Sequence, residues 1–132
     1  MRAVLLDTGP LVAFLNRRDR HHAWASQAWQ TAAVPMVTCE AVISEAMFLV
    51  RSLPGAQMAV LELVARGVVR IEPVVGDNVR DVMALMQKYA DLPTSLADAC
   101  LLCLADRHPK AAVMTLDGDF AVYRRRDGQA ID

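Results

Sequence analysis

The sequence has few cysteines and no long apolar run. Cys39, Cys100 and Cys103 form an odd set, and the apolar run at residues 3–6 is too short for a secretory leader. This usage favours a reducing cytoplasm. Cys100 and Cys103 are expected to be small core residues, because no second cysteine pair completes a zinc or redox site. No stretch reaches the ~20 apolar residues of a membrane span, so no membrane association is expected.

Neither sign of charge is in excess. Fourteen basic and 15 acidic residues give a formal net charge of −1, which excludes a whole-molecule field that attracts nucleic acid. Lys88 and Lys110 are the only lysines, and the other basic residues are arginines. Arginine suits bidentate contacts with phosphate or carboxylate, although genome base composition produces the same bias. The 132 residues, of which 55% are hydrophobic, are expected to form one domain over residues 1–132.

The apolar pattern alternates short strands with helices. Strands are expected at 3–6, 35–38, 68–71 and 111–115, and helices at 8–15, 22–32, 39–52, 56–65, 77–89 and 95–107. The tail at 120–131 is a candidate for an additional edge strand. This alternation predicts an α/β fold, a three-layer sandwich with a central parallel sheet of four to five strands.

Two aspartates follow buried strands. Asp7 ends the apolar run at 3–6, and Asp117 follows the run at 111–116. Both are predicted at the carboxyl edge of the sheet, where open α/β sheets bind ligands. The alternatives are a helix cap for Asp7 and a tight turn for Asp117. A turn does not require the second carboxylate of Asp119, and no calcium loop follows.

Glu45 lies in a predicted helix, in the spacing of its apolar neighbours. It shares an i, i+3, i+4, i+7 pattern with Val42, Ala46 and Leu49, which predicts a position on the inward stripe. The alternative is an acid at the edge of the stripe that reaches solvent.

Asp98 is the one carboxylate in the otherwise apolar run 96–104. A helix that is apolar all round is expected to be buried. Ser95 stands three residues earlier, so the alternative role of Asp98 is to complete a capping box.

Taken together, these acids point to a shared metal ion. A buried carboxylate is costly unless it is paired or binds a cation. Ligands that are all oxygen suit Mg²⁺ or Mn²⁺. Such a metal positions water for in-line attack on phosphorus and stabilises the leaving oxygen. The sequence therefore predicts metal-dependent phosphodiester chemistry.

Four ordered motifs resemble those of one known family. They are Leu-Leu-Asp-Thr-Gly-Pro-Leu at 5–11 with Asp19 and His22 after it, Thr-x-x-x-Val-x-x-Glu-Ala at 38–46, Tyr-Ala-Asp-Leu-Pro at 89–93 with Leu-Ala-Asp-Ala at 96–99, and Thr-Leu-Asp-Gly-Asp-Phe at 115–120. In order and spacing the chain resembles the PIN-domain family, in particular the VapC-type toxin ribonucleases, over nearly its whole length.

The resemblance implies an endoribonuclease dependent on Mg²⁺ or Mn²⁺ that cleaves single-stranded or loop RNA. Asp7, Glu45, Asp98 and Asp117 would form the catalytic, metal-binding cluster, with Asp119 sharing or taking the fourth position and Thr115 orienting groups by hydrogen bonding. Such toxins are typically homodimers, neutralised by an antitoxin whose tail enters the catalytic groove. Gly9 stands where many members have Asn or Ser, so it offers no side-chain oxygen.

Other interpretations remain open. A PIN-like RNA-processing nuclease without a toxin role would carry the same acids, whereas an inactive RNA- or protein-binding module would not need all four. A receiver domain is disfavoured because Asp7 has no acidic partner beside it, and a haloacid-dehalogenase-type phosphatase is disfavoured because position 9 is glycine.

Two basic clusters are candidates for RNA contact. Arg124, Arg125 and Arg126 follow the last acidic motif closely, so at least one of them is expected near the catalytic edge to hold RNA phosphates. The alternative is a solvated edge strand. The cluster at 17–22, with three arginines and two histidines, is expected to be a solvated loop, with phosphate contact as its alternative.

Overall fold

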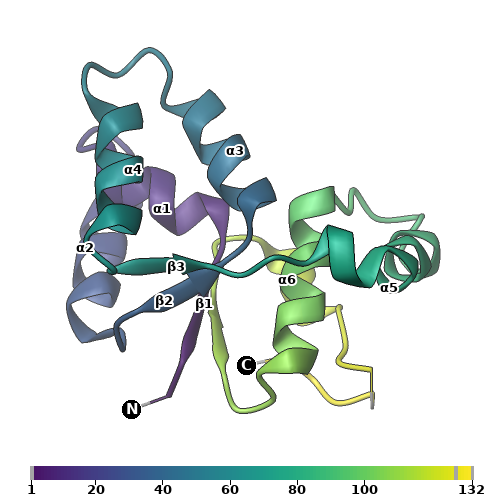
Figure 1. Cartoon of the computed structure of the whole chain (residues 1–132). Helices are drawn as coiled ribbons and strands as arrows, with labels where there is room; N and C mark the ends of the chain where they lie inside the picture. The colour runs from purple at the N-terminus through teal and green to yellow at the C-terminus, as the bar shows by residue number, and fades with distance from the viewer. Residues whose placement is uncertain (1, 127, 132) are drawn as a thin grey trace.

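A four-stranded parallel sheet organises the fold (Figure 1). The computed structural model describes residues 2–126 and 128–131. The strand order is β3-β2-β1-β4, with β1 at Val4–Leu6, β2 at Met36–Thr38, β3 at Val69–Ile71 and β4 at Ala112–Met114. Leu5 of the inner strand β1 lies opposite Val37 and Val113. The parallel sheet and the α/β class are as predicted.

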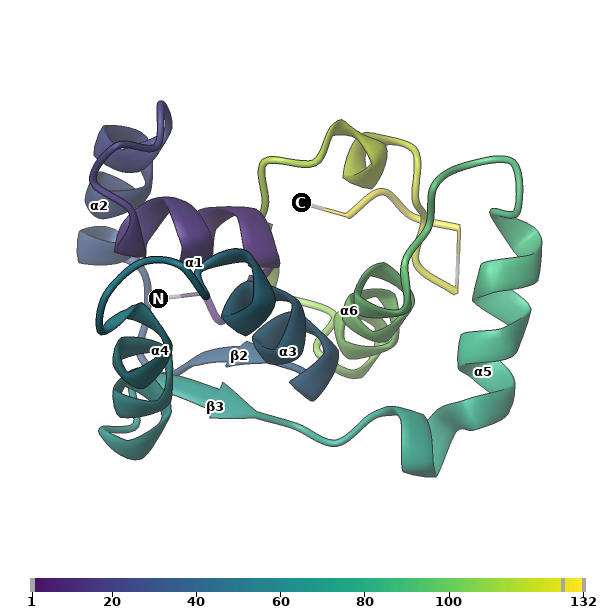
Figure 2. The ribbon, with the colours of Figure 1, turned by 90° about the horizontal axis from the view of Figure 1, so that it is seen from above.

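Helices cover both faces of this sheet (Figures 1 and 2). They are α1 (Thr8–Leu15), α2 (His22–Thr31), α3 (Glu40–Leu49), α4 (Ala56–Ala65), α5 (Val75–Lys88) and α6 (Leu96–Arg107), followed by the short 3₁₀ helix η1 (Gly118–Ala121). None of the described helices is long and apolar enough to cross a membrane.

Alternate strand residues supply two separate cores. Successive side chains of a strand point to opposite faces of the sheet. Leu5 and Val37 pack with α6, whereas Leu6 and Met36 pack with side chains of α1, α3 and α4. Burial of both faces gives the three-layer sandwich and explains why the strands are almost entirely apolar.

The three cysteines are free and buried, as expected of small core residues. Cys100 and Cys103 lie on α6, where every residue from 97 to 105 is buried. The helix is therefore surrounded by protein, and the position of Asp98 within it is the exception that requires an explanation.

The tail differs from the prediction. Its described residues form η1 and one isolated antiparallel bridge between Arg124 and Ala130, and they add no strand to the sheet. Phe120 and Tyr123 are 5% and 0% exposed and join the core around α6. Burial of these two rings turns the segment toward α6 and prevents it from running along the sheet edge. Residue 127 of the expected strand lies outside the described residues.

Candidate active site

A cleft of about 430 Å³ opens at the carboxyl edge of the sheet. Its walls come from α1, α3, the start of α6 and the segment after β4. Figure 2 shows how these elements are arranged. The four predicted acids Asp7, Glu45, Asp98 and Asp117 all line it. The fold thus brings together residues that are up to 110 positions apart in the sequence.

Asp7 is fixed at both of its carboxylate oxygens. It caps α1, since Oδ1 accepts a 2.8 Å hydrogen bond from the Thr8 backbone N–H. Oδ2 accepts a 2.6 Å hydrogen bond from the Thr115 hydroxyl. The same hydroxyl accepts a 2.9 Å bond from the backbone N–H of Asp117. Capping and site formation are therefore compatible for Asp7, and Thr115 links two of the acids.

Asp98 combines the two roles that the sequence left open. It completes a capping box with Ser95, whose hydroxyl accepts from the Asp98 N–H at 3.1 Å and whose N–H donates to Asp98 Oδ2 at 3.3 Å. Oδ2 also accepts a 3.1 Å bond from the Tyr123 hydroxyl. The described hydrogen bonds of this carboxylate all use Oδ2, so Oδ1 remains available to a ligand in the cleft.

Tyr123 is a site residue that sequence reasoning missed. It is fully buried, and its hydroxyl also lies 2.9 Å from Thr94 Oγ1. Burial raises the pKa of Tyr123 to about 12, so it remains a hydrogen-bond donor at neutral pH. The available signal was an aromatic pair, Phe120-x-x-Tyr123, in a tail rich in charged residues.

Negative charge on the carboxylates of the cleft is energetically unfavourable. Burial is the main cause that raises the pKa of Asp7 above 3.8, and repulsion from Asp98 and Asp117 adds to it, while the bonds from Thr115 and Thr8 oppose the rise. Burial also raises the pKa of Asp98, with repulsion from Asp117 as a further contribution. A cation in the cleft would relieve both the desolvation and the repulsion.

The donors in the cleft fit a hard cation that keeps part of its water. All are oxygens, and they include the hydroxyl of Thr8, a residue 4% exposed whose Oγ1 has no hydrogen-bond partner among the described residues. Among the described residues, no three His, Cys, Asp or Glu side chains are placed so that they could hold a metal ion together. Mg²⁺ does not need three such ligands, because it typically binds one or two carboxylates and several waters.

Glu45 is in the cleft but not in the core. The sequence placed it on the inward stripe of its helix, and that prediction was wrong: α3 buries Val42, Ile43 and Ala46, whereas Glu45 is exposed. Leu49, the fourth member of the expected stripe, is 50% exposed and also lines the cleft. The expected stripe is therefore divided: Val42 and Ala46 face the core, whereas Glu45 and Leu49 face the cleft, of which α3 forms one wall.

Asp117 and Asp119 occupy different positions. Asp117 lines the cleft, and its Oδ1 accepts a 2.9 Å bond from the Asp119 N–H at the start of η1. Asp119 is not among the residues that line the cleft. A further carboxylate, Asp19 of the α1–α2 loop, does line it. The sequence placed Asp19 in a motif but gave it no role.

Gly9 also lines the cleft, next to Leu116. A Cβ at position 9 would lie 3.3 Å from Leu116 Cβ, which is closer than ordinary van der Waals contact. The glycine found here in place of a polar residue therefore permits the close approach of α1 to the segment after β4.

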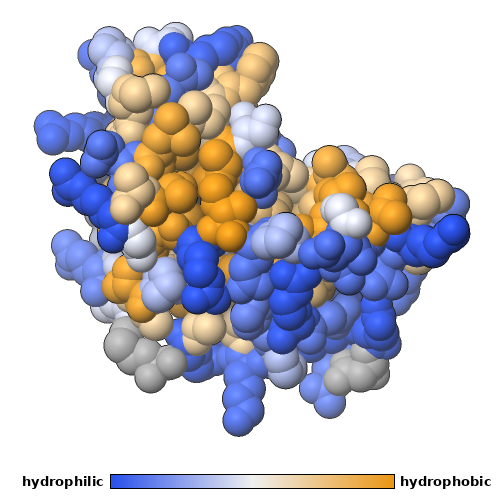
Figure 3. Space-filling model, viewed as in Figure 1, coloured by the Kyte–Doolittle hydropathy of each residue, from blue (hydrophilic) through white to orange (hydrophobic). Residues whose placement is uncertain are grey.

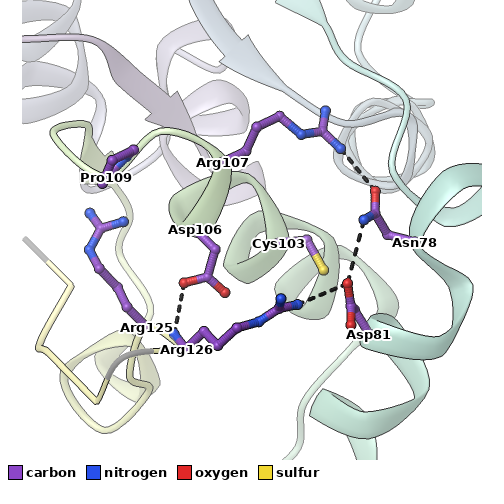
Figure 4. A pocket seen from close by; sticks show the side chains of 8 residues that line it. All are labelled: Asn78, Asp81, Cys103, Asp106, Arg107, Pro109, Arg125 and Arg126. Carbon is purple, nitrogen blue, oxygen red and sulfur yellow. Dashed lines mark hydrogen bonds and ion pairs between the residues drawn. The ribbon is translucent and has the colours of Figure 1, made fainter.

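Arg125 and Arg126 of the arginine run line a cavity other than the acidic cleft (Figure 4). Arg125 is buried and donates to the backbone oxygens of Ala105 and Ala111. Arg126 pairs with Asp81 at 2.9 Å and lines a separate cavity of about 500 Å³. Ala105 is seven residues beyond Asp98, about 10 Å along the helix axis. These contacts anchor the tail to the far end of α6, and RNA contact by this run remains an untested prediction.

The chain is similar to proteins of known family and structure. The family model described as PIN domain matches residues 4–126. Ribonuclease VapC26 of Mycobacterium tuberculosis is 28% identical over 116 residues, which cover 86% of each chain. The crystal structure of M. tuberculosis VapC20, described as a sarcin-ricin loop cleaving toxin, superimposes with a TM-score of 0.82 at 22% identity, over 91% of this chain and 94% of that one. The chain belongs to the PIN domain family.

Proposed function

We propose that this protein is an endoribonuclease that requires Mg²⁺ or Mn²⁺ and acts as the toxin of a type II toxin–antitoxin pair. The observation that carries the proposal is the convergence of Asp7, Asp98 and Asp117 on one cleft, where burial and mutual repulsion favour a bound cation. Membership of the PIN domain family and the similarity to a protein named ribonuclease VapC26 support it.

Asp7 and Asp98 are the proposed direct ligands, because they are the two buried carboxylates of the cleft. When bound, the metal ion supplies a Lewis acid that activates water and stabilises the leaving oxygen of the cleaved phosphodiester. Thr115 and Tyr123 hold the two carboxylates in place by donating hydrogen bonds to them. Such outer partners fix the orientation of a ligand and its basicity.

Glu45 and Asp117 are more exposed than the two proposed ligands. Their proposed role is to orient the attacking water: their carboxylates accept hydrogen bonds from water in the cleft and so direct it toward the phosphate. We give this role to Asp117 and not to Asp119, because Asp117 lines the cleft and Asp119 does not. The proposed substrate is single-stranded or loop RNA, whose backbone an open cleft can admit without unwinding a duplex.

The proposed protein partner is a cognate antitoxin, and the proposed assembly is a homodimer. Exposed apolar side chains lie on α3 and α4 beside the cleft, and Figure 3 shows this apolar area on the face viewed there. They include Phe48, Leu49, Met58 and Leu61. Leu49 belongs to both the apolar area and the cleft, so an amphipathic antitoxin segment bound to this area would lead into the active site.

Controlled expression followed by sequencing of the 5′ ends of cellular RNA tests the function. New 5′ ends should appear at defined sites in loop or single-stranded RNA, and growth should stop. If a short reading frame adjoins the gene and encodes the antitoxin, its co-expression should restore growth. The absence of new ends, despite soluble folded protein, would contradict the ribonuclease proposal. New ends without a growth defect would contradict the toxin role alone.

A further inference from the structure

Most arginine side chains of the described chain are already engaged. Arg125 binds backbone oxygens in the interior, Arg126 pairs with Asp81, and Arg70 and Arg107 both pair with Glu72. Within residues 2–126 and 128–131, the guanidinium groups without a hydrogen bond, ion pair or ring contact belong to Arg17, Arg18 and Arg80. Two of these three lie side by side in the loop between α1 and α2.

The loop that carries Arg17 and Arg18 is held in shape by its own hydrogen bonds. Asn16 Oδ1 accepts from the Arg18 backbone N–H at 3.0 Å, and Asp19 Oδ1 accepts from the His21 N–H at 2.8 Å. His22 Nδ1 lies 2.8 Å from the Ala13 carbonyl oxygen and ties the end of the loop to α1. A ligand bound here would therefore order side chains and little backbone, which lowers the entropic cost of binding.

The two free arginines line a cavity next to the acidic cleft. The acidic cleft includes Val12 of α1, Leu49 of α3 and Asp19 of the loop. The second cavity, of about 600 Å³, includes Leu15 of α1 and Ser52 of the turn that follows α3, together with Arg17 and Arg18. Leu15 is three residues beyond Val12 on α1, which is about 4.5 Å of axial rise. Figure 2 shows α1 leading from the end near α6 to this loop.

A cleft lined by acids repels phosphate unless cations lie nearby, and the net charge of −1 supplies no general attraction. From the position of the free arginines we infer that Arg17 and Arg18 form a subsite for the RNA backbone, which binds phosphates a few nucleotides from the scissile bond. Guanidinium groups suit this role because they bind phosphate oxygens in a bidentate manner. The inference rests on the proposed ribonuclease function and specifies where that function holds its substrate.

The test compares RNA binding by three proteins that all carry Asp98→Asn, so that the RNA stays intact. They are the parent, Arg17→Gln/Arg18→Gln, and the control Arg66→Gln/Arg80→Gln. The control removes the same charge from the C-cap of α4 and from α5. Arg66 forms only an exposed pair with Glu62, and Arg80 has no partner among the described residues. The probe is a fluorescein-labelled single-stranded RNA of about 20 nucleotides and mixed sequence, longer than the ~16 that a single-strand binding module covers. Anisotropy is measured across a range of salt concentrations.

The Arg17→Gln/Arg18→Gln protein should bind RNA roughly 10-fold more weakly than the parent. The slope of log affinity against log salt should fall by about 1.4, at ~0.7 for each single-strand phosphate contact. The control should match the parent. Equal affinity and slope for all three proteins, or an equal loss in the control, would overturn the subsite. If the parent binds no RNA and the wild-type protein cleaves none, the proposed function fails as well. If the wild type cleaves RNA and the two arginines make no difference, the subsite alone fails.

Discussion

The hydroxyl of Tyr123 donates a 3.1 Å hydrogen bond to Oδ2 of Asp98. The two residues come from different elements: Asp98 lies in the first turn of α6, and Tyr123 follows η1 in the tail. Tyr89 and Phe120 contact the Tyr123 ring edge-on, with centroids 4.8 and 5.0 Å away. Arg125 fixes the tail two residues later. The tail thus supplies a buried donor, packed between two other rings, to a carboxylate of the active site.

Tyr123→Phe should impair metal binding while the fold is kept. The hydrogen bond from Tyr123 lowers the pKa of Asp98, so its loss raises that pKa further. Because the ionised carboxylate binds the cation, the acid limb of kcat/KM against pH should move to higher pH. Mn²⁺ affinity should fall by ~10- to 100-fold.

Tyr89→Phe is the matched control for this change. The Tyr89 hydroxyl accepts a 3.0 Å bond from the Arg124 N–H, and no bond to Asp98 is among its contacts in the described chain. Its acid limb should stay at the wild-type pH. Identical profiles for the two variants would show that Tyr123 does not act through Asp98.

Thr115→Val should reduce activity through Asp7. The hydroxyl of Thr115 donates to Asp7 and accepts from the Asp117 N–H, so valine removes both contacts at nearly constant volume. The pKa of Asp7 should rise, and activity should fall by ~10- to 100-fold. Thr115→Ser keeps the hydroxyl and should restore most of the activity. Wild-type turnover by the valine variant would remove Thr115 from the site.

The carboxylates at strand ends could be predicted from sequence because strand direction alone decides which edge they occupy. Asp7 and Asp117 follow β1 and β4, and parallel strands place both at one edge. The exposure of Glu45 could not be predicted. The periodicity of apolar residues shows which side chains share one face of a helix, but it does not show whether that face packs against the core or lines a cleft. Tyr123 was missed because its role depends on how the tail packs on α6. The burial of Arg125 against α6 likewise depends on how the tail packs, and proximity in sequence carries no information on it.

Glu72→Gln should lower stability at neutral pH by about 1–3 kcal/mol, the usual range for hydrogen bonds to charged groups. Burial raises the pKa of Glu72, but hydrogen bonds from His108, Arg107 and Arg70 outweigh it and hold the pKa at about 2. A lowered pKa stabilises the fold above the ordinary value of 4.5, and this contribution is lost as the pH falls toward 2.

Urea denaturation between about pH 2 and pH 7 measures this contribution. The difference between wild type and Glu72→Gln should shrink as the pH falls through that window. Glu62→Gln removes an exposed carboxylate that pairs with Arg66 and should change stability by less than ~1 kcal/mol. If the difference in unfolding free energy between wild type and Glu72→Gln were the same at every pH, the ionisation of Glu72 would not contribute to the acid sensitivity of the fold.

Asp98→Asn should raise the melting temperature of the metal-free protein at neutral pH. The pKa of Asp98 is raised in the fold, so its favourable contribution exists below its ordinary pKa of 3.8 and is lost as the pH rises through the folded value. Asparagine can keep one oxygen as acceptor for the Ser95 N–H and the Tyr123 hydroxyl. Mn²⁺ should stabilise the wild type by mass action and the variant much less. A variant that melts below the metal-free wild type, or responds equally to Mn²⁺, would contradict this.

Cleavage of a labelled single-stranded RNA by the purified protein tests the central claim most directly. Wild type should cut the RNA in Mn²⁺ or Mg²⁺, stop when a chelator is added, and resume when excess metal is restored. Asp98→Asn should lose more than the ~10- to 100-fold expected for an outer partner of the ligands. Undiminished cleavage in chelator, or wild-type cleavage by Asp98→Asn in saturating Mn²⁺, would contradict a metal-dependent ribonuclease built on this acidic cleft.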